Sequence, residues 1–392
     1  MTSSTSTAPQ EPAQRSESEP TEKSTSSAGE GVQPVKLVIG AVGLVVTVWV
    51  AVNLFLAISY YPQWFGGRLG IGAVAIVAGV GGAFGMFSFL NVFIEALPRR
   101  FSGGLIPYAF LLPGFSLVVL ILIYPTIQTI HYSFANSEST AYVGLENYRA
   151  IFADGAFLQA IFNNVLWIIV VPAATVVFGV IVAVLADKLS ATGEKAAKGF
   201  IFLPMAISFV GASAIWVTLV YAYSPPGEAQ TGLLNAVFTG LGGEPQAWLN
   251  ISAGRLNSLL LMVILIWLQV GFAMILLSSA IKGVPQDTVE AARIDGANEF
   301  QVFWRVTVPQ IKTTIITVYI TVLILVMKVF DIVYVVTNGS FKTEVIANLF
   351  FKELFNARQA GQAAAIVVVL LIAVLPVMYY QIKAFRREEA GL

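Results

Sequence analysis

The sequence predicts an all-α integral membrane protein with about eight transmembrane helices. Hydrophobic residues make up 57% of the chain and charged residues only 11%, whereas roughly a quarter of the residues of a soluble domain are charged. The apolar residues gather in runs of about twenty or more, which are long enough to cross about 30 Å of hydrocarbon. Lipid offers no partner to a free amide or carbonyl, so each run is expected to be helical.

The first 35 residues are predicted to form a disordered tail on the cytoplasmic side. They are rich in Ser, Thr, Glu and Pro and nearly free of large apolar side chains, so they cannot bury enough surface to offset their chain entropy. The stretch lacks the short apolar core and cleavage site of a signal peptide, and we expect it to stay attached.

Eight apolar runs separated by charged or polar segments follow the tail. Reading them as spans gives Lys36–Tyr60, Ile71–Leu97, Ile106–Tyr132, Leu158–Ala186, Phe200–Tyr223, Ser258–Ile281, Thr313–Val336 and Ala363–Ile382.

Basic residues are distributed unevenly between the two sides that these spans define. One side collects fifteen and the other six, which together with Lys328 inside a span account for the 22 basic residues. The positive-inside bias then places the fifteen, and both termini, in the cytoplasm of a multi-pass plasma membrane protein.

Composition also argues against several kinds of chemistry. There is no cysteine and only one histidine, so no metal site is predicted. The formal net charge is zero, which gives no reason to expect a nucleic acid partner. No Gly-x-x-x-x-Gly-Lys-Ser/Thr phosphate loop is present, so the chain is not expected to bind a cofactor or to hydrolyse ATP itself.

The segment 283–309 between the sixth and seventh spans is predicted to fold as helix, turn and helix at the cytoplasmic face. Pro285 suits a helix start, and Gly296 suits a turn that other residues resist. Phe300, Phe303 and Trp304 follow at helical spacing before Pro309 ends the second helix.

This segment resembles the EAA loop of the permease subunits of binding-protein-dependent, type I ABC importers, and we refer to it as the coupling loop. Glu-Ala-Ala at 290–292, Gly296 and Pro309 stand at the spacing of that loop, and the Asp-Gly-Ala at 295–297 is typical of its sugar permeases. The resemblance extends over about Ile106–Arg387. The segment Val143–Tyr148 is similar to one found in sugar permeases, and Lys328–Asp331 is similar to that of the α-glucoside and related disaccharide branch.

The resemblance implies a six-helix permease core at 105–392, preceded by two additional transmembrane helices at 36–104. It implies import of a small sugar, a disaccharide or α-glucoside, by a chain that is not an enzyme. The implied partners are a second permease subunit, an ABC ATPase dimer that uses the ATP, an extracytoplasmic sugar-binding protein, the sugar and the membrane lipid. The residues expected to couple the chain to the ATPase are Glu290, Ala291, Ala292, Asp295, Gly296, Ala297 and Pro309.

Candidates for the substrate pathway come from polar and aromatic side chains inside spans. Trp267, Gln269 and Phe272 offer ring faces and an amide within one and a half helical turns. By resemblance, Leu268, Gln269 and Phe272 fall where the maltose-type cavity is lined.

Two further pairs complete the set of candidates. Asn163 and Asn164 are amides near the outer end of the fourth span. Lys328 and Asp331 are costly inside lipid, and their spacing would put them on one helical face.

Two alternatives remain open on the sequence. An ion- or proton-coupled secondary carrier would usually show buried carboxylates near the middle of the membrane and inverted halves. An ABC permease for a solute that is not a sugar would differ only in the lining of its pathway.

Overall fold

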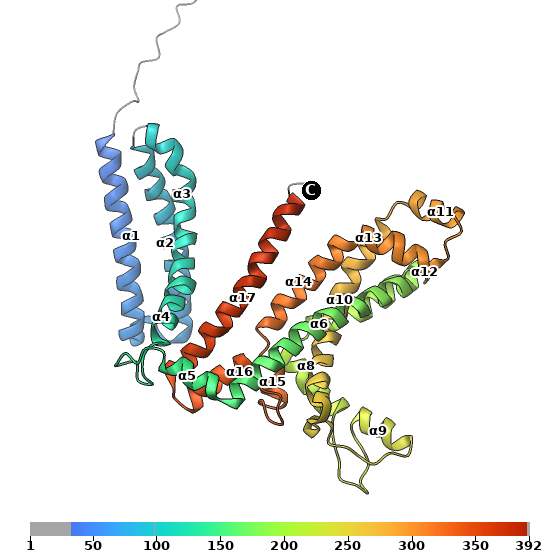
Figure 1. Ribbon diagram of the computed structural model, residues 1–392. Coiled ribbons are helices and arrows are strands. Elements are labelled where there is room, and N and C mark those ends of the chain that lie inside the picture. The colour runs from blue at the N-terminus through green and yellow to red at the C-terminus, as the bar shows by residue number, and fades with distance from the viewer. Residues whose placement is uncertain (1–32, 98, 390–392) are drawn as a thin grey trace, which may run out of the picture. The chain divides into compact units, whose positions relative to one another are not determined.

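The computed structural model describes residues 33–97 and 99–389. Six of its helices are long and apolar enough to cross a membrane, and two bent helix pairs raise the number to eight if each pair is one span. These eight follow the order of the predicted spans, which confirms the all-α membrane fold (Figure 1). The predicted tail lies almost entirely outside the described residues. Helix α1 begins at Pro34, slightly before the predicted start of the first span.

The chain divides into two compact units, Met1–Ile123 and Tyr124–Leu392. The division falls within the third span, where α3 (Arg99–Val118) continues through the π-helical Val119–Ile123 into α4. The domain boundary predicted at 104/105 rests on family resemblance and on the charged, glycine-containing sequence 99–104, and it stays a prediction.

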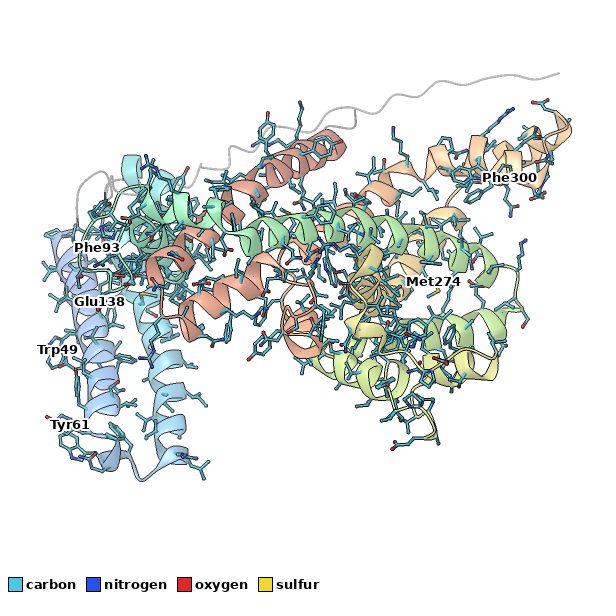
Figure 2. The ribbon with its side chains drawn as sticks, turned by 60° about the horizontal axis from the view of Figure 1, so that its bottom comes forward. Trp49, Tyr61, Phe93, Glu138, Met274 and Phe300 are labelled. Atoms are coloured by element: carbon cyan, nitrogen blue, oxygen red, sulfur yellow. The ribbon has the colours of Figure 1, made fainter. Side chains whose placement is uncertain are left out.

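In the first unit, α1 (Pro34–Tyr60) packs along α2 (Arg68–Glu95) after a short turn. Glycines set the close approach: a Cβ on Gly40 would lie 2.6 Å from the Phe93 backbone, and one on Gly43 would overlap the Phe89 ring. Small residues allow such contacts between membrane helices. Trp49 and Tyr61 point away from this seam (Figure 2), and side chains of this kind suit a lipid-facing surface.

The second unit holds the remaining helices. Their bounds are α4 Tyr124–Tyr132, α5 Glu146–Ala153, α6 Gly155–Ala186, α7 Ala191–Phe202, α8 Phe209–Ile215, α9 Leu233–Gly240, α10 Leu256–Lys282, α11 Gln286–Ile294, α12 Glu299–Val302, α13 Val308–Gln310, α14 Lys312–Met327, α15 Asp331–Val336, α16 Ile346–Phe351 and α17 Ala360–Glu389.

Helices α6, α10 and α14 form the centre of this unit. Trp167 of α6 and Leu261 of α10 are fully buried in one apolar cluster, and Met274 and Val318 are fully buried in another. Gly179 lies so close to α10 that an added Cβ would come within 2.7 Å of Ala273. These contacts make α6 and α10 one closely packed pair.

Two of the predicted single helices are interrupted. The fifth span bends by 106° between α7 and α8, because Pro204 has no N–H to donate and Ser208 starts a new helix by accepting a hydrogen bond from Gly211 N at 3.1 Å. The seventh span ends at Met327 and resumes at Asp331. The expectation that Lys328 and Asp331 share a helical face is therefore wrong.

Candidate functional site

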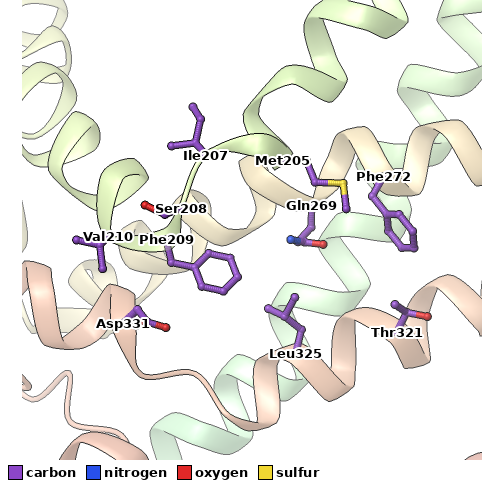
Figure 3. A pocket seen from close by; sticks show the side chains of 10 residues that line it. All are labelled: Met205, Ile207, Ser208, Phe209, Val210, Gln269, Phe272, Thr321, Leu325 and Asp331. Carbon is purple, nitrogen blue, oxygen red and sulfur yellow. The ribbon is translucent and has the colours of Figure 1, made fainter. Parts of the chain in front are cut away.

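A cavity of about 540 Å³ lies where the interrupted fifth span faces α10 and α14 (Figure 3). Its volume is within the usual range for small-molecule sites. The lining residues are Met205, Ile207, Ser208, Phe209, Val210, Gln269, Phe272, Thr321, Leu325 and Asp331.

The cavity combines apolar walls with a few polar groups. Figure 3 shows the Gln269 amide between Met205 and Leu325, with the Phe209 ring directed toward the same space. The Thr321 hydroxyl already donates to Thr317 O at 2.8 Å. Among the described residues, by contrast, neither the Gln269 amide nor the Asp331 carboxylate has a hydrogen-bond partner or an ion pair. Both can therefore accept hydrogen bonds from a bound molecule, and Gln269 can also donate.

A smaller cavity of about 330 Å³ adjoins the first and shares Phe209, Leu325 and Asp331 with it. Lys328 lines this second cavity and is exposed. No ion pair joins Lys328 to Asp331 within residues 33–97 and 99–389, so the two charges face the cavities rather than neutralising each other.

The two asparagines of the fourth span lie elsewhere. The Asn163 amide is fully buried, donates to Lys342 O at 2.9 Å and Glu344 O at 2.7 Å, and accepts from Arg255 at 3.0 Å. Asn164 accepts a hydrogen bond from Ile346 N at 2.8 Å. Their hydrogen-bonding groups hold the backbone that connects α15 to α16, and neither residue lines the cavities.

The remaining candidates divide in the same way. Trp267 packs edge-on against Trp216, with ring centroids 5.7 Å apart, and Leu268 is buried in the core. Gln269, Phe272 and Asp331 are thus the predicted residues that meet in the main cavity. The segment 205–210 was missed by sequence reasoning, although Pro204 followed by Ser208 inside an apolar run is a signal of a helix break.

The coupling loop has the predicted helix, turn and helix. Gly296 has φ +85°, Gly296 N donates to Arg293 O and Ala297 N donates to Ala292 O, both at 3.0 Å. This is the Schellman arrangement, in which a left-handed glycine ends a helix. The prediction of a glycine turn is confirmed.

Four further hydrogen bonds brace the turn. Asn298 and Gln301 exchange side-chain-to-backbone hydrogen bonds of 2.9 Å, which form a capping box at the start of α12. Arg293 donates twice to Glu299, at 2.9 and 3.2 Å, and these hydrogen bonds raise the pKa of Arg293. The Asn-x-x-Gln spacing could have revealed the capping box from the sequence.

Many residues of the coupling loop are exposed. Glu290, Ala291 and Gly296 are all exposed. Ile294 is 86% exposed and Phe300 72%, and Figure 2 shows Phe300 at the outlying end of the loop.

No group of three or more His, Cys, Asp or Glu side chains that could hold a metal ion lies within the part of the chain that the structure describes.

Helices long enough to span a membrane, a cavity with apolar walls and a few polar groups at two interrupted spans, and an exposed helix–turn–helix loop are features of the membrane component of a transport system. Residues 175–387 match the family described as binding-protein-dependent transport system inner membrane component. The chain belongs to this family, and it is the permease subunit of an ABC importer rather than an enzyme.

Relatives and solved structures agree with this placement. The osmoprotective compounds uptake permease protein GgtC of Synechocystis sp. is 50% identical over 68% of this chain and 94% of its own length. The alpha-glucoside transport system permease protein AglF of Rhizobium meliloti is 47% identical over 74% of this chain and 86% of its own. A chain of a bacterial alginate ABC transporter, in complex with an alginate pentasaccharide-bound periplasmic protein, shares the fold with a TM-score of 0.60 and 23% identity, over 70% of this chain and 92% of that one.

Proposed function

We propose that this permease passes a small α-glucoside across the plasma membrane through the cavity that contains Gln269. The observation that carries the proposal is the lining of that cavity. Phe209 and Phe272 offer ring faces, while Gln269 and Asp331 offer hydrogen-bonding groups without partners among the described residues. Sugars present both apolar C–H faces and hydroxyl groups, so this combination suits them.

The names of two relatives narrow the class of substrate. One is named for alpha-glucosides and the other for osmoprotective compounds. Both names are compatible with a small, neutral and highly hydroxylated solute, which matches a cavity with one amide and one carboxylate. A solute that is not a sugar is the second candidate, favoured by the osmoprotectant relative.

Energy for transport would come from an ABC ATPase dimer that docks on the coupling loop. Ile294 and Phe300 supply apolar contact and Glu290 a charge, while the residues at 291, 292, 296 and 297 are small enough for a partner to approach closely. Closure of the dimer would move the loop, and the spans behind it would open the cavity to alternate sides. A second permease subunit and an extracytoplasmic sugar-binding protein would complete the importer, with both termini in the cytoplasm.

The substrate proposal is tested with the complete importer in proteoliposomes. Uptake of labelled maltose, trehalose and a glucosylated polyol would be compared with uptake of glycine betaine, a small osmoprotectant that is not a sugar. We expect ATP-dependent uptake of at least one α-glucoside, and competition among the α-glucosides. Uptake of glycine betaine alone would contradict the assignment.

A further inference from the structure

Four charged residues at the loop end of the second unit form a closed ring of alternating sign. Lys198 Nζ lies 3.3 Å from Asp187 and 2.5 Å from Glu194. Lys282 Nζ lies 3.5 Å from Asp187 and also pairs with Glu194. Each acid therefore contacts both lysines, and each lysine contacts both acids. Ser278, only 2% exposed, joins the ring by donating to Asp187 at 3.0 Å and by accepting from Lys198.

The ring ties three helices together. Asp187 caps the end of α6, Glu194 and Lys198 belong to α7, and Ser278 and Lys282 belong to α10. The side chains of Asp187, Glu194 and Lys198 are only about one-fifth exposed. An isolated surface ion pair contributes little, whereas a partly shielded network with this geometry can hold helix ends in register.

The ring lies at the root of the coupling loop. Lys282 is the last residue of α10 before the loop begins at Gly283. A cavity of about 810 Å³ on this surface is lined by Asp187 and Lys282 of the ring together with Glu290 and Arg293 of the loop. The ring and the loop therefore line the same cavity. Because Lys282 directly precedes the loop, a displacement of the loop acts on Lys282 first.

The other end of α7 reaches the substrate cavity. Ile201 and Phe202 press on Gly271, where an added Cβ would lie 2.4 Å from Ile201 O. Gly271 stands between Gln269 and Phe272, and the chain beyond α7 supplies Met205 and the following lining residues. Helix α7 thus runs from the ring to the cavity wall and contacts α10 at both ends.

We propose that the ring formed by Asp187, Glu194, Lys198 and Lys282 is the joint through which movement of the coupling loop reaches the substrate cavity. Its members are positioning residues that act through α7. The inference rests on the proposed ATPase coupling, and it adds that α7 must stay fastened to α10 for the cavity to respond.

The test uses a readout that requires no sugar. The native chain has no cysteine, so Thr321→Cys in the cavity lining provides a single label site in this chain, and its labelling is followed on this chain after the subunits are separated. Its rate of reaction with a maleimide would be measured in the complete importer, with and without ATP and vanadate. In this background we expect nucleotide to change the rate. Adding Glu194→Gln, which removes one charge of the ring, should reduce that change roughly two- to thirtyfold. Lys195→Gln on the same helix, at an exposed position outside the ring, should not.

A rescue experiment separates positioning from simple folding. Glu194→Cys with Lys282→Cys removes two ring charges, and a bifunctional thiol reagent can then fasten α7 to α10 covalently. We expect sugar transported per ATP hydrolysed to fall in the double variant and to recover after cross-linking, with neither single cysteine variant recovering.

Four results would overturn the proposal. A nucleotide response that survives Glu194→Gln, or a cross-link that forms without recovery, would refute the role of the ring and leave the proposed ATPase coupling standing. Loss of the protein from the membrane in both ring variants would make the ring a folding contact. No nucleotide response in the Thr321→Cys background would refute the coupling account itself, and the ring with it.

Discussion

At the scale of single residues, two buried amides in neighbouring helices differ in their hydrogen bonding. Asn163 is fully buried with its donor and acceptor groups committed to Arg255 and two carbonyls, whereas Gln269 is 7% exposed and has no partner among the described residues. The sequence identified both as polar groups inside spans, but it could not tell them apart. The difference depends on whether a distant backbone segment reaches the amide. The Glu344 carbonyl that accepts from Asn163 lies 181 residues away along the chain.

Replacing Gln269 by Ala should weaken sugar uptake while leaving the amount of protein in the membrane and basal ATP hydrolysis unchanged. Loss of one hydrogen-bonding partner corresponds to roughly a ten- to hundredfold rise in the KM for uptake. Trp267→Phe is the matched control, because Trp267 lies on the same helix but outside the cavity. An equal effect of the two changes would show that the cavity has been assigned to the wrong face of α10.

Asn163→Ala should act on stability instead. The change leaves the Arg255 side chain and the Lys342 and Glu344 carbonyls with fewer partners, which should cost about 3 kcal/mol of folding free energy. We expect a lower melting temperature in detergent and an unaltered KM for uptake by the protein that remains folded. A raised KM at an unchanged melting temperature would return Asn163 to the substrate pathway.

At the scale of elements, hydropathy predicts the existence and order of the spans but not their interruptions. The break at 328–330 buries Val329 and Ile332 in the core while Lys328 stays exposed, which a continuous helix through Asp331 could not do as well. The turn at Gly296 was predictable because only a local backbone requirement decides it. The break after Met327 was not, because packing against other helices decides it, whereas Pro204 and Ser208 are a local signal of the break in the fifth span.

The capping box at Asn298 gives a test at this scale. Asn298→Ala removes the side chain that accepts from Gln301 N, which should cost about 1 kcal/mol of local stability. We expect faster amide hydrogen exchange over residues 299–302 and weaker retention of the ATPase. Gln310→Ala, an exposed change just beyond the far end of the loop, is the control. Exchange rates that are the same in both variants would mean that the ion pair between Arg293 and Glu299 holds the turn by itself.

At the scale of the whole molecule, the uneven distribution of basic residues predicts a direction for the chain in the membrane. Cysteines placed singly at positions 195 and 290 should be unreactive toward an impermeant reagent in intact cells. Cysteines at 147 and 342 lie on the other predicted side. Asn147 is buried and donates two hydrogen bonds, so position 342, on an exposed turn, is the cleaner reporter. Labelling at 290 in intact cells, with none at 342, would reverse the predicted orientation.

We propose that a separate ATPase drives this permease through the coupling loop. Gly296→Leu tests this coupling most directly. A Cβ added at Gly296 meets no atom within 4 Å, so we expect the loop to hold leucine at a backbone cost of roughly 1–2 kcal/mol, but the side chain would stand where the proposed ATPase must approach. Gly296→Ala carries the same backbone cost without the bulk. The measurement is ATPase retained by the purified complex together with hydrolysis stimulated by loaded binding protein. We predict that both are lost or strongly reduced in Gly296→Leu and largely kept in Gly296→Ala, with the permease still inserted. Normal retention, stimulation and uptake in Gly296→Leu would reduce the loop to a connector and contradict the account.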